Sequence, residues 1–194
     1  MGELPEEGTA YETIVITDSG RNAAALSAVR HGGYLHLRSF SGSNTFENMK
    51  RMERFSVNYI SHENRMLFVD AALKGWGNDE REFSDEIEPE PFPHLRDASS
   101  WAVCIPESIR IESVSDEIGE TEVLHVEAKI LMWEGSASGT IMVGEDRNIM
   151  ALVAYTRYLI SEGEVRERFG RMAMGLADEK DHVGREVLDR LKDF

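Results

Sequence analysis

The chain has 194 residues, of which 41% are hydrophobic and 29% are charged, which is ordinary for one soluble globular domain with a terminal appendage. Its 36 acidic and 21 basic residues give a formal net charge of -15, which argues against nucleic-acid binding over a broad basic surface. No apolar run reaches the roughly 18 residues of a membrane span, and no basic-plus-apolar signal segment opens the chain, so a cytoplasmic location is expected.

The first part of the sequence predicts short antiparallel strands. Residues 11–17 alternate in strand fashion, residues 22–29 return as a second strand of very small side chains, and residues 34–38 alternate again. Turn residues separate these segments, so we expect a meander in an antiparallel sheet or barrel. A fourth strand is expected at residues 55–60, and a short amphipathic helix at residues 65–73.

A turn rich in hydroxyl groups joins the third strand to a short helix. It holds Ser39, Ser41, Gly42, Ser43, Asn44 and Thr45. Free N–H groups and the positive dipole end at a helix start favour an anion, which indicates a phosphate site. Residues 30–54 carry five Arg or Lys and two Glu, a basic island in an acidic chain.

The alternative interpretation of this corner is an N-capped surface helix that binds nothing. Asn44 or Ser43 would then be the cap, and Glu47 would form a capping-box-like pair with Asn44. Phe46 and Met49 would bury one face of the helix.

Residues 75–97 contain eight acidic residues and three prolines, which predicts an irregular loop. The loop is either a solvated excursion or a lid over a ligand, with Trp76, Phe83 or Phe92 as covering aromatic residues. Strands resume at residues 100–105, 109–114 and 121–133.

The last part of the chain has helical periodicity. One helix begins at Asp146 or just after it, and two more are expected at residues 164–174 and 182–191. We therefore expect a barrel-forming domain at residues 1–145 and a helical appendage at residues 146–194.

Several kinds of chemistry lack a sequence signal. The six histidines show no metal-site spacing, and there is no nucleophile elbow, Walker loop or dinucleotide-binding glycine motif. The single cysteine, Cys104, lies in an apolar run and is expected to be a small buried hydrophobe. We nominate no catalytic side chain and no metal ligand.

The run GSNTFENMKRMERFSVN at residues 42–58 resembles the signature of the FMN-binding split-barrel superfamily, which is related to flavin reductases. It is most similar to a largely archaeal branch of unknown function. Further similarity lies in YETIVIT at residues 11–17, LFVDAAL at residues 67–73 and NIMALVAYTRYL at residues 148–159.

The resemblance implies a mainly β fold with C-terminal helices (α+β), an antiparallel Greek-key split β-barrel of the FMN-binding type. It also implies FMN as cofactor, bound near the interface of a homodimer, with the helices packed on the barrel or on the partner subunit. Ser43, Asn44 and Thr45, with Arg38 nearby, would hold the phosphate. Main-chain groups of Leu26, Ser27, Ala28 and Val29 would edge the ring, and Ser39 and Phe40 would bridge the two.

The partner subunit would supply further contacts, for example from Trp133 or the turn at Arg147 and Asn148. The activity implied is that of a flavin-dependent oxidoreductase of flavin reductase-like type, because flavin chemistry resides in the cofactor. Its redox partner would be NAD(P)H or another small molecule, and its substrate is open. The alternatives are a non-catalytic FMN carrier, sensor or storage module, and a structural dimer module that binds no flavin.

Overall fold

The computed structural model describes residues 3–17, 22–73, 87–89 and 91–192. They form two compact units. The first comprises Met1–Val114 with Thr121–Val143, and the second comprises Ser115–Glu120 with Gly144–Phe194. The predicted boundary near residue 145 stays a prediction, as does the surface against which the helices pack.

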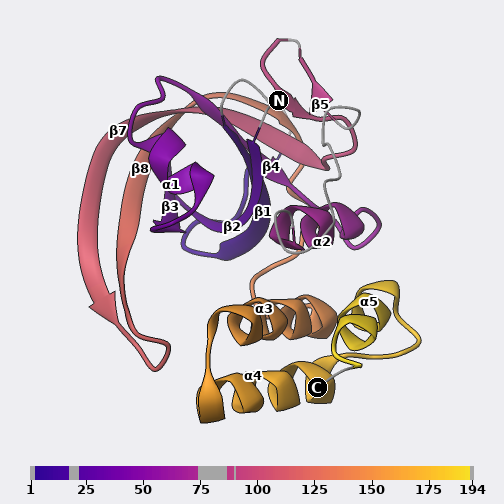
Figure 1. Ribbon diagram of the computed structural model, residues 1–194. Coiled ribbons are helices and arrows are strands. Elements are labelled where there is room, and N and C mark those ends of the chain that lie inside the picture. Colours follow the sequence, from indigo (N-terminus) through magenta and orange to yellow (C-terminus); the bar gives the residue numbers. More distant parts are fainter. Residues whose placement is uncertain (1–2, 18–21, 74–86, 90, 193–194) are drawn as a thin grey trace. The chain divides into compact units, whose positions relative to one another are not determined.

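Six antiparallel strands close into a barrel in the first unit (Figure 1). The order around the barrel is β1, β2, β3, β8, β7 and β4, with β4 paired back to β1. The sequence therefore follows a Greek key, because β1, β2 and β3 are consecutive and β4 returns beside β1. The strands are β1 Ala10–Thr17, β2 Asn22–His31, β3 Tyr34–Phe40, β4 Phe55–Tyr59, β7 Ser100–Ser115 and β8 Glu120–Gly135.

Alternate residues of each strand fill the barrel. Tyr11 and Val15 of β1, Ala28 of β2 and Leu35 and Leu37 of β3 belong to the buried core cluster. Their neighbours in sequence face outward, as the period of two predicts. Cys104 also lies in this cluster, so the prediction of a buried cysteine is confirmed, and burial raises the pKa of its thiol.

Two short helices complete the first unit. The helix α1, Asn44–Met49, packs against β1, β2 and β3 and lies across the opening of the barrel in Figure 1. Phe46 and Met49 extend from it into the core cluster. The helix α2, Met66–Leu73, packs on β1 and β2 through buried residues that include Phe68 and Val69.

The structure corrects the expected strands at residues 100–114. They form one strand, β7, rather than two separated by Pro106. The pairing of β7 with β4 ends at Cys104, so Pro106 lies just beyond that ladder and its missing N–H breaks no bond to β4. Pro106 therefore lies just beyond the pairing with β4, within a strand that continues to Ser115.

The loop expected at residues 75–97 contains a small two-stranded sheet. Its strands are β5 Ile87–Glu88 and β6 His94–Leu95, paired antiparallel. The Leu95 N–H donates to Oδ1 of Asn58 at 2.8 Å, which joins this segment to β4. Trp76 and Phe83 lie outside the described residues, so the lid interpretation stays a prediction.

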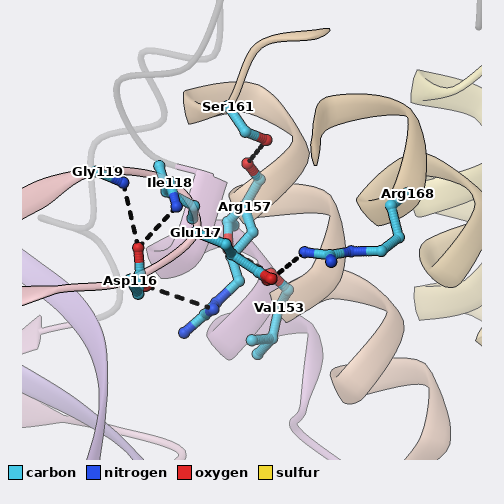
Figure 2. A network of polar contacts seen from close by, with 9 residues as sticks. Asp116, Glu117, Ile118, Gly119, Val153, Arg157, Ser161 and Arg168 are labelled. Carbon is cyan, nitrogen blue, oxygen red and sulfur yellow. Dashed lines mark hydrogen bonds and ion pairs between the residues drawn. The ribbon is translucent and has the colours of Figure 1, made fainter. Parts of the chain in front are cut away.

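Three helices form most of the second unit: α3 Arg147–Ile160, α4 Gly163–Leu176 and α5 His182–Arg190. Asp146 and Asp181 cap α3 and α5 by accepting main-chain N–H groups. Figure 2 shows the turn Ser115–Glu120 beside two of these helices, where Asp116 pairs with Arg157 at 3.9 Å and Glu117 pairs with Arg168. These pairs are half exposed, so each contributes at most about 1 kcal/mol.

No helix in the described part of the chain has the length and apolar character needed to cross a membrane.

Gly135, at the end of β8, has a positive φ of 86° and a close neighbour. A Cβ there would lie 2.5 Å from the Ser99 carbonyl oxygen and 2.7 Å from Cα of Ser100. Gly139 has a φ of 76° but open space around it. We expect Gly135→Ala to lower the free energy of unfolding by about 1 to 3 kcal/mol more than Gly139→Ala, because both substitutions carry backbone strain but only one adds overlap. Urea unfolding of the two variants measures the difference, and equal losses would contradict the close approach.

Candidate functional site

The strands β2 and β3 stay paired along only part of their length. Their ladder runs from His31↔Tyr34 to Ala28↔Leu37. Beyond that point residues 22–27 of β2 are paired with β1, and residues 38–40 of β3 are paired with β8. We call this divergence of β2 from β3 the split.

Of the four residues that were expected to edge a flavin ring, Leu26 and Ser27 lie on the β2 side of the split, whereas Ala28 and Val29 lie in the last rungs of the β2–β3 ladder. Ala28 and Leu26 face the core, whereas Ser27 and Val29 face outward. The Leu26 carbonyl accepts from the Thr13 hydroxyl at 2.9 Å, so it is directed toward β1.

The β3 side of the split carries Arg38, Ser39 and Phe40. Arg38 and Phe40 face outward and are exposed, Phe40 to 52%. Ser39 faces inward, is 1% exposed, and lies 3.2 Å from the Ser43 hydroxyl. The guanidinium of Arg38 makes no hydrogen bond or ion pair to any described residue, so the cation is available to a ligand.

Ser43 is the N-cap of α1, so one of the two expected caps is confirmed. Its hydroxyl donates to the Phe40 carbonyl at 2.9 Å and accepts from the Phe46 N–H at 3.1 Å. Because its one proton is used, the Ser39 hydroxyl is the donor of their shared bond. Glu47 forms no capping box with Asn44 and instead pairs with Lys50 at 3.3 Å.

Thr45 is the best-anchored residue of the first turn of α1. Its hydroxyl is the acceptor of a 2.8 Å bond from Asn22, whose amide also donates to Thr17 at 2.9 Å. The Thr45 hydroxyl donates to no described residue, so its proton remains available. The main-chain N–H groups of Asn44 and Thr45 likewise have no acceptor among the described residues, as is usual for a first turn.

The basic island contributes fewer free cations than its sequence suggested. Arg30 donates to the carbonyls of Pro5 at 2.6 Å and Gly32 at 3.0 Å, so it is committed to the N-terminal segment. Lys50 is paired with Glu47. Arg38, Arg51 and Arg54 are the exposed cations that remain of the five.

A buried acid next to this region was not predicted. Glu12 of β1 is 6% exposed, and burial raises the pKa of its carboxyl to about 7. It makes no side-chain hydrogen bond or ion pair with the described residues. The sequence signal was a glutamate on the same face as Ile14 and Ile16, both of which are buried.

Four further residues that could contact a ligand make contacts within the chain: Asn58, Trp133, Arg147 and Asn148. Asn58 donates to the Ile14 carbonyl at 3.0 Å and is fully buried. The Trp133 ring lies edge-on to the Tyr59 ring, with 5.1 Å between the ring centroids. Arg147 donates to the Gly175 carbonyl at 2.6 Å, and Asn148 accepts from the Asp178 N–H at 2.9 Å.

In the described structure the first turn of α1 is joined to β2 by the bond from Asn22 to Thr45, and residues 26–29 lie at the end of the β2–β3 ladder. A ring-shaped ligand at the unpaired edge of β2 would meet main-chain groups there, and the start of α1 would favour an anion. Whether such a ligand binds through these residues stays a prediction.

Comparison with known proteins agrees with this fold. A crystal structure of an FMN-bound protein from Methanosarcina mazei is similar over 97% of this chain and 95% of its own, with a TM-score of 0.69 and 22% identity. A putative flavin reductase with a split-barrel domain from Shewanella frigidimarina covers 69% of this chain and 73% of its own, with a TM-score of 0.48 and 18% identity. An NADH:FAD oxidoreductase from Streptomyces globisporus covers 73% and 81%, with a TM-score of 0.49 and 9% identity.

No curated protein matches the sequence significantly. The similarity to the Methanosarcina protein establishes the fold, an antiparallel split barrel followed by helices, as the sequence resemblance predicted. A family model described as "Protein of unknown function (DUF447) N-terminal domain" matches residues 11–136, which is more than half of the chain. The chain belongs to this DUF447 family.

Proposed function

We propose that this chain binds FMN at the split. The observation that carries the proposal is the match along nearly the whole chain to a protein whose structure contains FMN. The gathering of phosphate-type and ring-type residues around one divergence of two strands supports it. The residues present fit the cofactor, because a flavin mononucleotide needs anion donors at one end and main-chain groups along its pyrimidine edge.

The phosphate would lie at the first turn of α1. The Thr45 hydroxyl proton, the N–H groups of Asn44 and Thr45, and the Arg38 guanidinium are donors without a partner among the described residues. Ser43 and Ser39 would support the phosphate indirectly, because their hydroxyls hold each other and fix the start of the helix.

The ring would lie against residues 26–29 of β2, with Phe40 across the split. Of these residues, Ser27 has main-chain groups directed toward β3 at the split, where a flat ligand could meet them. Bound flavin supplies hydride or electron exchange, and the protein supplies placement and electrostatics.

With FMN bound, we infer a flavin-dependent oxidoreductase of flavin reductase-like type that exchanges electrons with NAD(P)H or another small molecule. We further infer a cytoplasmic homodimer with the flavin near its interface. The second candidate is a carrier, sensor or storage module that binds FMN without turning over a substrate.

Absorption spectroscopy of the purified protein tests these functions. Retained or added FMN should give a protein-bound flavin spectrum in the near-ultraviolet and blue. Anaerobic NADH or NADPH should then bleach it if the chain is a reductase, whereas a carrier would stay yellow. Failure to bind added FMN would exclude both functions.

Removal of the Thr45 hydroxyl should weaken FMN binding. We expect Thr45→Val to cost about 1.5 to 3 kcal/mol of binding free energy, roughly 10- to 150-fold in Kd, because one hydroxyl contact to a charged oxygen is lost. Fluorescence quenching of FMN measures the Kd. Thr17→Val is the matched control, because Thr17 accepts from the same Asn22 amide outside the first turn of α1. It should lower stability and leave FMN affinity of the folded protein unchanged.

Arg38 should distinguish ligands with and without a phosphate. We expect Arg38→Gln to weaken FMN binding by about 1 kcal/mol, roughly fivefold, because an exposed cation is partly screened by solvent. Riboflavin, which lacks the phosphate, should bind the variant and the wild type equally. Arg51→Gln should change neither ligand, and an equal loss for both ligands in Arg38→Gln would contradict the phosphate role.

A further inference from the structure

The main-chain hydrogen bond of Glu12 and its register with β2 show where its side chain lies on β1. Its N–H donates to the Ile141 carbonyl at 2.9 Å, on the side of β1 away from β2. Its register partner on β2 is Ser27. The two residues therefore form a non-hydrogen-bonded pair, in which Cα atoms are about 4.5 Å apart and the side chains lie close together on one face.

Glu12 and Ser27 are on the outer face of the barrel, because Tyr11 and Val15 lie on the opposite face of β1 and belong to the core. The same pairing directs the main-chain groups of Ser27 away from β1 and toward β3. Ser27 comes immediately before Ala28, the last β2 residue in the ladder with β3. The Glu12 carboxyl is thus beside the residue whose main chain faces the split.

Among the residues that the structure describes, the Glu12 carboxyl has no charged partner to hold it ionised. The ionisable residues on helices and strands packed against β1 include Glu47 of α1, Asp70 of α2, and Arg30 and His31 of β2, and the segment 140–143 has none. Arg30 is committed to main-chain carbonyls. Burial alone raises the pKa of Glu12, to about 7, so the acid keeps its proton in mildly acidic solution.

We propose that the protonated Glu12 side chain binds the pyrimidine edge of the flavin beside Ser27. This inference rests on the proposed function. The pyrimidine edge presents carbonyl acceptors beside an N–H donor, and a carboxylic acid both donates and accepts, so the two groups are complementary. An ionised carboxylate can only accept and would face a ring carbonyl, so binding weakens as Glu12 loses its proton.

The experiment measures riboflavin affinity of the full-length protein at pH 6 and pH 8.5 by fluorescence quenching. Riboflavin removes the titrating phosphate of FMN from the comparison. The wild-type Kd should rise by up to about 30-fold, the change in protonated fraction for a pKa near 7. Glu12→Gln keeps one donor and one acceptor but does not titrate, so its Kd should be nearly constant. Glu12→Leu should bind weakly at both pH values, and the exposed Glu53→Gln should follow the wild type.

Equal pH profiles for wild type and Glu12→Gln would overturn the inference while flavin binding itself stood. A flat wild-type profile would do so without any variant. Absence of binding in every protein at both pH values would overturn the proposed function as well.

A second readout needs no flavin. A folded-state pKa above the unfolded value of 4.5 means that Glu12 favours folding at low pH and that this contribution is lost as pH rises toward about 7. The thermal midpoint of the wild type should therefore fall relative to Glu12→Gln between pH 5 and pH 8. Parallel midpoints would contradict the raised pKa and with it the inference.

Discussion

The end of the β2–β3 ladder at Ala28 and Leu37 is the constraint on which the candidate site depends. Past this rung one strand continues along β1 and the other along β8, so main-chain groups of β2 are left facing a space between strands. Phe46 and Met49 of α1 enter the core at this end of the barrel and are at most 2% exposed. Burying each gives about 1.5 to 3 kcal/mol, which offsets the ladder bonds that the divergence forgoes.

The bounds of β1, β3 and β4 match the expected strands to within two residues. β3 alternates between more buried and more exposed positions because one of its faces packs in the barrel, whereas β1 and β4 are buried on both faces. Residues 109–114 were expected as a separate strand, whereas the structure joins them to residues 100–105 in β7 through residues 106–108. This continuity was not predictable, because the sequence does not reveal that the pairing of β7 with β4 ends at Cys104, before Pro106.

The residue types at the candidate site were predictable from the sequence, but their hydrogen-bond partners were not. The serines before α1 and the threonine in its first turn indicated anion donors. However, the Ser43 hydroxyl donates to the Phe40 carbonyl, and the Arg30 guanidinium donates to the carbonyls of Pro5 and Gly32. These commitments depend on segments far apart in the chain, which periodicity and motif spacing do not register. Glu12 was missed for a related reason, because its significance comes from register with Ser27 and from burial, and neither is a property of β1 alone.

A chain with a formal charge of -15 gains nothing from its overall field when it binds a phosphate-bearing ligand. At physiological ionic strength that field is screened beyond about 8 Å, so groups in direct contact decide the affinity. Arg38 and the first-turn N–H groups of α1 supply positive potential at the phosphate end of the proposed site. At the ring end of the proposed site a neutral group is needed, because an ionised carboxylate would repel the ring carbonyls. Burial, with no cationic partner among the described residues, raises the pKa of Glu12 to about 7, so under the proposal the desolvation that costs stability at high pH would also make the acid a hydrogen-bond donor in mildly acidic solution.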